Sequence, residues 1–194
     1  MIRLGILGSG SGSNMQAILD AIKTGTLEAE IVLVLSDISD AYILERAAQA
    51  GLPTGLIDCR GLTSKFPEEA QEETTEALRQ SNVELVCLAG FMRLLRAPLL
   101  DAFAGRIINI HPSLLPSYPG LNAWTQALEA GAGESGCTVH YVDAGMDTGQ
   151  VIAQAAVPVM ADDTPEALHA RIQVEEHRIY PEAIAKVATS LRSG

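Results

Sequence analysis

The sequence of 194 residues lacks any apolar run that approaches the ~18 residues of a membrane-spanning helix. Its apolar N-terminal stretch is also too short to be a secretory signal peptide. Only three cysteines occur, Cys59, Cys87 and Cys137, and none of them lies in a C-x-x-C pair or another metal-binding spacing. These absences predict a cytoplasmic protein with reduced thiols and no membrane partner.

Basic residues are also scarce, because 13 Lys and Arg stand against 24 Asp and Glu and give a formal net charge of −11. Proteins that bind nucleic acid rely on many Lys and Arg contacts to phosphate, so the charge predicts no nucleic-acid partner. A small anionic ligand is still compatible, since backbone N–H groups can bind one phosphate in an acidic protein. With 47% hydrophobic residues, the chain can bury the core of one domain, predicted over residues 1–194.

Apolar strand-like runs alternate with helical patterns through the first half of the chain. Such alternation predicts an α/β fold with an open, mainly parallel twisted sheet and helices on both faces. Near the C-terminus, two apolar runs are joined by the short segment DAGMDTGQ, which predicts antiparallel strands added to the parallel core. The strands are expected at 3–7, 30–36, 54–58, 83–90, 106–110, 137–142 and 151–159, and the main helices from 14 and over 41–51, 67–80, 122–131 and 164–191.

The glycine loop GSGSGSN, residues 8–14, joins the first predicted strand to the first helix. It lacks the Lys-Ser/Thr of a Walker A loop, and Ser13 stands where a dinucleotide-binding loop needs its third glycine. Gly12, Ser13 and Asn14 would still present N–H groups and side-chain donors at a helix N-terminus, which is a suitable site for one phosphate group. The alternative is a flexible strand–helix turn with Asn14 as the helix cap.

The segment INIHP places Asn109 and His111 at the end of a strand, before a loop stiffened by prolines. Because side chains alternate along a strand, both should point to the same side. An amide could donate to a carbonyl oxygen that becomes negative, while an imidazole could move a proton. The alternative is that both residues are structural, with Asn109 at the edge of the sheet and His111 as a capping residue.

A carboxylate near this histidine would favour its protonated form. The segment DAGMDTGQ offers Asp143 and Asp147, and Gly145 and Gly149 allow an unusual backbone path around Asp147. A simple hairpin turn explains the same pattern equally well, so both interpretations stay open.

Other polar residues are interpreted as structural. Ser113 lies in no nucleophile elbow, Cys87 lies within a buried strand, and His140 is expected to be a satisfied structural histidine. Glu176 and His177 are expected on a solvated helix face. Four scattered histidines predict no metal site.

Several segments together resemble the phosphoribosylglycinamide formyltransferase family. They are GSGSGSN, LAGFMRLL, INIHPSLLPSYPGL, DAGMDTG and EEHRIYP, and they follow the family's order over nearly the whole chain. NIHPSLLP is typical of the wider formyl-folate group, whereas GSGSGSN and EEHRIYP narrow the resemblance to this family. The resemblance implies a Rossmann-like formyltransferase fold and transfer of a formyl group from the co-substrate 10-formyltetrahydrofolate to 5-phosphoribosylglycinamide in purine biosynthesis, without a metal. It implies small-molecule partners and a monomer or homodimer.

The resemblance also implies roles for individual residues of this chain. It implies that Asn109, at the reacting formyl group, His111, the general acid, and Asp147, which supports the histidine, are catalytic. One difference from the family is Asn122-Ala123-Trp124, because a histidine often follows the preceding leucine there. The remaining implied contacts are Gly12, Ser13, Asn14 and Glu176 for the ribonucleotide, and Lys65, Met92, Arg93, Leu94, Leu95 and Asn109 for the folate.

Three rival functions are compatible with parts of the pattern. Methionyl-tRNA formyltransferase has a similar core but needs a further C-terminal RNA-binding domain, which a short acidic chain does not suggest. Formyl-folate deformylase would hydrolyse the same donor, but its family carries an additional N-terminal domain. A non-catalytic nucleotide-binding module would explain the glycine loop, but it would not explain Asn109, His111 and Asp147.

Overall fold

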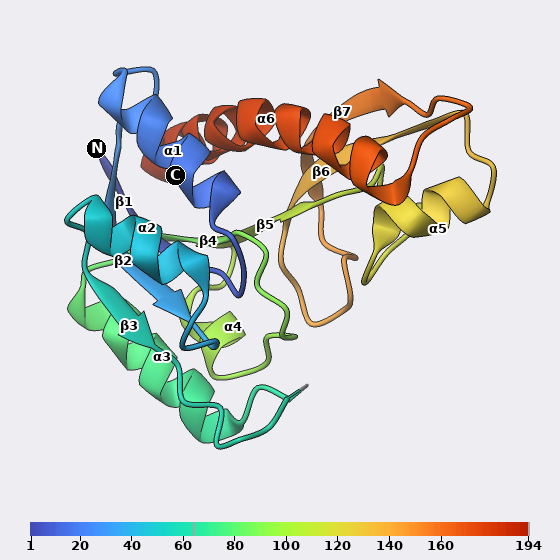
Figure 1. Ribbon diagram of the computed structural model, residues 1–194. Coiled ribbons are helices and arrows are strands. Elements are labelled where there is room, and N and C mark those ends of the chain that lie inside the picture. Colours follow the sequence, from blue (N-terminus) through green and yellow to red (C-terminus); the bar gives the residue numbers. More distant parts are fainter. Residues whose placement is uncertain (64, 194) are drawn as a thin grey trace.

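The computed structural model describes residues 1–63 and 65–193. Within these residues, seven strands form one sheet in the order β3-β2-β1-β4-β5-β6-β7 (Figure 1). The pairs among β1 to β5 are parallel, and β6 pairs antiparallel with both β5 and β7. The predicted mixed sheet is confirmed. Its strands are β1 (Ile2–Leu7), β2 (Ala29–Ser36), β3 (Thr54–Leu56), β4 (Leu85–Leu88), β5 (Ile107–His111), β6 (Glu134–Tyr141) and β7 (Val151–Pro158).

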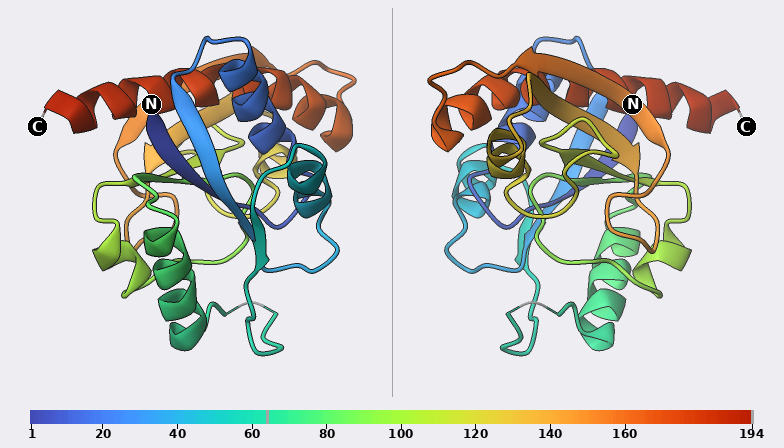
Figure 2. Two further views of the ribbon diagram at one scale, coloured as in Figure 1. Left: turned by 90° about the vertical axis from the view of Figure 1, so that its left-hand side faces the viewer. Right: turned by 90° about the vertical axis from the view of Figure 1, so that its right-hand side faces the viewer.

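Helices cover both faces of this sheet, as predicted. Helices α1, α2 and α6 share one buried apolar cluster with the sheet, and α3 and α4 share a second cluster. Figure 2 shows α6 and α3 on opposite sides of the strands. No described helix is long and apolar enough to cross a membrane. The helices are α1 (Ser13–Lys23), α2 (Tyr42–Gln49), α3 (Glu68–Gln80), α4 (Leu99–Ala102), α5 (Ala123–Glu129) and α6 (Pro165–Ser193).

Strand β6 begins three residues earlier than the sequence pattern predicts. The segment Glu134–Gly136 contains residue types that are depleted in strands, so local propensity hides it. Pairing with β7 overrides that propensity, and a Cβ atom at Gly136 would lie 2.0 Å from the carbonyl oxygen of Ala155. Glycine is therefore needed at this position because the neighbouring backbone approaches so closely.

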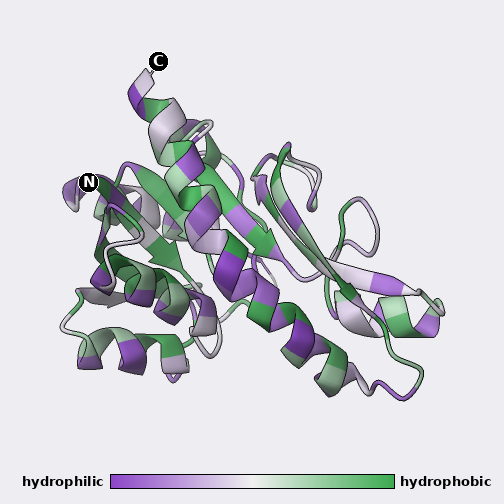
Figure 3. Ribbon diagram, turned by 90° about the horizontal axis from the view of Figure 1, so that it is seen from above, coloured by the Kyte–Doolittle hydropathy of each residue, from purple (hydrophilic) through white to green (hydrophobic). Residues whose placement is uncertain are grey.

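Helix α6 positions part of the cavity described below. Hydrophobic and hydrophilic residues are interspersed along it (Figure 3). Its buried apolar residues form a stripe that packs in one cluster with residues of the sheet. Tyr180 on this stripe is fully buried, and its hydroxyl donates to the carbonyl oxygens of Leu88 (2.8 Å) and Ile108 (3.3 Å). These bonds fix α6 across β4 and β5, with Glu176 one turn away.

Candidate active site

A cavity of about 540 Å³ opens at the carboxyl edge of the parallel strands. Open α/β sheets bind their ligands at this edge. The loops after β1, β4 and β5, the segment before β7 and one face of α6 all contribute to its wall. The cavity lining includes every predicted site residue except Lys65: Gly12, Ser13, Asn14, Met92, Arg93, Leu94, Leu95, Asn109, His111, Asp147 and Glu176.

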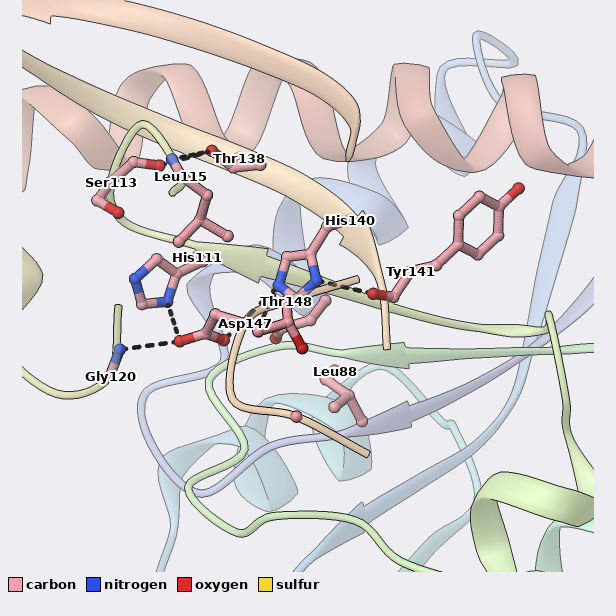
Figure 4. Close-up of polar contacts among 12 residues, drawn as sticks. Leu88, His111, Ser113, Leu115, Gly120, Thr138, His140, Tyr141, Asp147 and Thr148 are labelled. Atoms are coloured by element: carbon pink, nitrogen blue, oxygen red, sulfur yellow. Dashed lines mark hydrogen bonds and ion pairs between the residues drawn. The ribbon is translucent and has the colours of Figure 1, made fainter. Parts of the chain in front are cut away.

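Asp147 lies between two histidines in the cavity wall (Figure 4). Its Oδ2 atom is 3.4 Å from His111 Nδ1 and accepts a hydrogen bond from Gly120 N–H at 2.8 Å, and its Oδ1 atom is 3.7 Å from His140 Nε2. Asp147 has a φ of 55°, in the left-handed region. A Cβ atom at Gly149 would lie 1.7 Å from the carbonyl oxygen of Tyr141, so this segment has the constrained path that the flanking glycines suggested.

His111 has an oxygen acceptor beside each of its ring nitrogens. The ring is 5% exposed, and its Nε2 atom lies 3.0 Å from the carbonyl oxygen of Tyr118. A carbonyl oxygen only accepts, so Nε2 must carry a proton. The other nitrogen, Nδ1, faces the Asp147 carboxylate. A doubly protonated ring could donate to both neighbours, so the ring must release one of these two contacts before it donates a proton to a ligand.

His140 lies in the same cavity wall, although its place in a strand predicts only a structural histidine. Its Nδ1–H donates to the carbonyl oxygen of Tyr141 (2.8 Å), so Nε2 is free to accept from the Asn109 amide at 3.2 Å. Burial lowers the pKa of His140, which keeps this acceptor unprotonated. His140 therefore orients Asn109 and leaves the second amide N–H of Asn109 available to a ligand.

The glycine loop, residues 8–14, turns its donors toward the cavity. Gly12 has a φ of 73° and is the N-cap residue directly before α1. None of the backbone N–H groups of residues 10–14 donates a hydrogen bond within the described residues. Free N–H groups at a helix N-terminus form a ready site for an anion.

Asn14 and Glu176 form a partly buried polar pair beside this loop. Asn14 Nδ2 donates to Glu176 Oε2 at 2.9 Å, while the buried Asn14 Oδ1 has no partner among the described residues. Asn14 lies within α1, so the alternative that its side chain caps this helix is wrong. Glu176 is 4% exposed rather than solvated, and burial raises the pKa of its carboxyl. A partly buried amide and a buried carboxyl thus line the cavity next to the candidate anion site.

Gly12→Ala should weaken both the fold and the loop. The added Cβ atom would lie 2.8 Å from the Cα atom of Ile43, and an alanine at positive φ costs about 1–2 kcal/mol. We expect a lower free energy of unfolding in urea and a higher KM for a phosphate-bearing substrate. An unfolding midpoint equal to that of the wild type would contradict this account of Gly12.

The predicted folate side of the cavity has an apolar mouth. Met92 and Leu94 are 61% and 44% exposed there, although both line the cavity. Arg93 is instead 7% exposed, because its guanidinium donates to Asp37 Oδ2 (2.6 Å) and to two backbone carbonyls of residues 62 and 65. The Arg93 guanidinium is thus bound to other parts of the protein. Lys65 lies outside the cavity lining, so its contact with folate stays a prediction.

The segment that differs from the family begins α5. Asn122 has a φ of 55° and is the N-cap residue directly before this helix. Trp124 stacks on His169 of α6, with ring centroids 3.8 Å apart and an interplanar angle of 9°. Both rings line the cavity, so Trp124 fixes the start of α5 on α6.

One buried and two partly buried histidines should make folding stability depend on pH. Burial lowers the pKa of His140, His169 and His177, and the Arg46 charge lowers that of His177 further. The unfolded chain then binds more protons than the folded chain below about pH 6.5, so the free energy of unfolding should fall as the pH drops from 7 to 5.5.

His169→Phe should keep the ring stack and reduce this slope. Glu176 acts in the opposite direction, because its raised pKa gives a contribution that is lost as the pH rises. The difference between variant and wild type, measured by urea unfolding at each pH, cancels this Glu176 contribution. An unchanged slope would show that His169 does not titrate as described.

Residues 2–184 match the formyl transferase family. The chain belongs to this family. It is 50% identical over 189 residues to the trifunctional purine biosynthetic protein adenosine-3 of Drosophila pseudoobscura pseudoobscura, covering 96% of this chain and 14% of that protein. It is 42% identical to the phosphoribosylglycinamide formyltransferase of Bacillus subtilis (strain 168), covering 96% of this chain and 95% of that protein.

A solved formyltransferase structure has the same fold. The glycinamide ribonucleotide transformylase 1 structure from Symbiobacterium toebii superposes with a TM-score of 0.91 at 54% identity, covering 95% of this chain and 86% of that one. The predicted resemblance and fold class are confirmed. Two of the curated relatives, from Escherichia coli (strain K12) and Bacillus subtilis (strain 168), are named phosphoribosylglycinamide formyltransferase, which is the kind of enzyme that the sequence predicts.

Proposed function

We propose that this chain transfers the formyl group of 10-formyltetrahydrofolate to the amine of 5-phosphoribosylglycinamide, as a single domain of residues 1–194. The products are formylglycinamide ribonucleotide and tetrahydrofolate, in purine biosynthesis. The observation that carries the proposal is one cavity that joins the free N–H groups of the glycine loop to Asn109, His111 and Asp147. The family membership supports formyl transfer, and the names of the relatives support the acceptor. Small-molecule substrates, a cytoplasmic location and a monomer or homodimer remain predictions.

The chemistry needs no nucleophile from the protein. The substrate amine attacks the formyl carbon directly, and the carbonyl oxygen becomes negative in the tetrahedral intermediate. Asn109 donates its free amide N–H to this oxygen, and protonated His111 supports it as well. Each such donor is worth on the order of 3 kcal/mol of transition-state stabilisation. The attacking amine then loses a proton, the folate nitrogen gains one, and the bond between that nitrogen and the formyl carbon breaks.

The two ends of the cavity suit the two substrates. The N–H groups of residues 10–14 would bind the ribose phosphate, and the partly buried Asn14–Glu176 pair would contact the glycinamide ribonucleotide beside it. The raised pKa of Glu176 favours a neutral carboxyl, which can both donate and accept hydrogen bonds. Met92, Leu94 and Leu95 would pack against the folate.

The decisive experiment compares acceptors with a single formyl donor. Purified protein should produce formylglycinamide ribonucleotide from 10-formyltetrahydrofolate only when glycinamide ribonucleotide is present. Release of formate without an acceptor would instead indicate a deformylase. Formylation of charged initiator tRNA at a comparable rate would favour the tRNA enzyme, against the expectation from the charge of −11.

A further inference from the structure

Helix α2 holds the glycine loop from the side opposite the cavity. Ile43 N–H donates to the carbonyl oxygen of Gly10 at 3.0 Å, and Arg46 Nε–H donates to that of Ser11 at 2.9 Å. Residues 10–14 all line the cavity, whereas Ile43 and Arg46 do not. Two consecutive loop carbonyls are therefore drawn away from the cavity.

Because the peptide unit is planar, the direction of each of these carbonyls also fixes the direction of the N–H group in the same unit. In a trans peptide the C=O and N–H bonds point in opposite directions. The Gly10 carbonyl shares its plane with Ser11 N–H, and the Ser11 carbonyl shares its plane with Gly12 N–H. Holding both carbonyls on α2 thus aims these two N–H groups at the cavity, where no described residue accepts from them.

Arg46 also brings a positive charge to the loop. It forms no ion pair with a carboxylate among residues 1–63 and 65–193, and its guanidinium lies 4.8 Å from the centre of the Tyr42 ring. Arg93 lines the cavity, but Asp37 neutralises it at 2.6 Å. In a chain of net charge −11, the charge of Arg46 therefore remains available to an anion at the glycine loop.

We propose that Arg46 is a positioning residue for the substrate phosphate, which it serves through the loop and without touching the phosphate. Its Nε–H fixes the peptide between Ser11 and Gly12, and its charge lies behind the N–H groups that face the anion. This inference rests on the proposed function, because it needs a ribose phosphate at the glycine loop.

The test uses Arg46→Gln and Arg46→Lys, with Arg79→Gln as the matched control. Arg79 is exposed on α3, across the sheet, so its replacement removes the same charge far from the loop. Arg46→Gln should raise the KM for glycinamide ribonucleotide about tenfold, with kcat and the KM for the folate changed by less than about twofold. Arg46→Lys keeps the charge and should recover part of the loss, and the control should match the wild type.

Binding of ribose 5-phosphate, measured by calorimetry, gives a second readout that needs no turnover. Its Kd should rise about as much as the KM for glycinamide ribonucleotide in Arg46→Gln. An unchanged Kd and KM in that variant would overturn the proposal. An equal loss of kcat and of both substrate affinities, with a lowered unfolding midpoint in both Arg46 variants, would also overturn it, because Arg46 would then only support the fold. If the wild type failed to formylate glycinamide ribonucleotide, the proposed function would fail, and the calorimetry would still test Arg46.

Discussion

Asn109→Ala and His111→Ala should each lower kcat by about 10²-fold or more, with the two substrate affinities little changed. Both side chains lie in the cavity wall at the end of β5, and they would serve the same oxygen of one tetrahedral intermediate. The double variant should lose far less than the product of the two single losses, since residues that act on one intermediate are not additive. Saturating kinetics on all three variants measure this directly.

The variant His111→Gln tests whether catalysis needs an acidic proton at position 111 or only a polar side chain that fills the space. Glutamine can donate one hydrogen bond toward Tyr118, but it cannot supply an acidic proton. Its kcat should therefore stay close to that of His111→Ala. A fully multiplicative double variant, or a near-normal kcat in any single variant, would show that the two residues do not share the oxyanion.

The sequence predicted those parts of the site that depend on a single strand and the loop after it. The alternation of side chains in β5 placed Asn109 and His111 together, and the general rule for parallel sheets placed the glycine loop at the same edge. Both predictions need only local periodicity. The seven-stranded sheet followed because its apolar runs are long enough to identify without tertiary information.

The sequence did not predict the partners that depend on register or helix rotation. His140 meets Asn109 because these residues are directly paired in the antiparallel β5–β6 ladder, and that register depends on the whole sheet. Glu176 is buried because α6 turns this residue toward Asn14, although its charge suggests a solvated face. The resemblance implied a folate contact for Arg93, but its guanidinium donates to Asp37, 56 positions away in the sequence.

Asp147→Asn should lower kcat about a hundredfold near neutral pH, as expected when the anion beside a catalytic imidazolium is lost. The amide has nearly the same shape as the carboxylate. An asparagine oxygen in the place of Oδ2 can still accept from Gly120 N–H and lie beside His111, so folding and substrate binding should be nearly intact. What disappears is the negative charge beside the imidazole of His111.

A double variant separates this charge effect from lost packing. If the carboxylate acts through His111, Asp147→Asn combined with His111→Gln should have nearly the kcat of His111→Gln alone, because residues that act as a unit are not additive. Asp147→Ala, which also removes the Gly120 bond, should add a rise in KM that asparagine avoids. A double variant that loses the full product of the two single losses would mean that the carboxylate does not act through His111, and Asp147 would then be only a structural partner of Gly120.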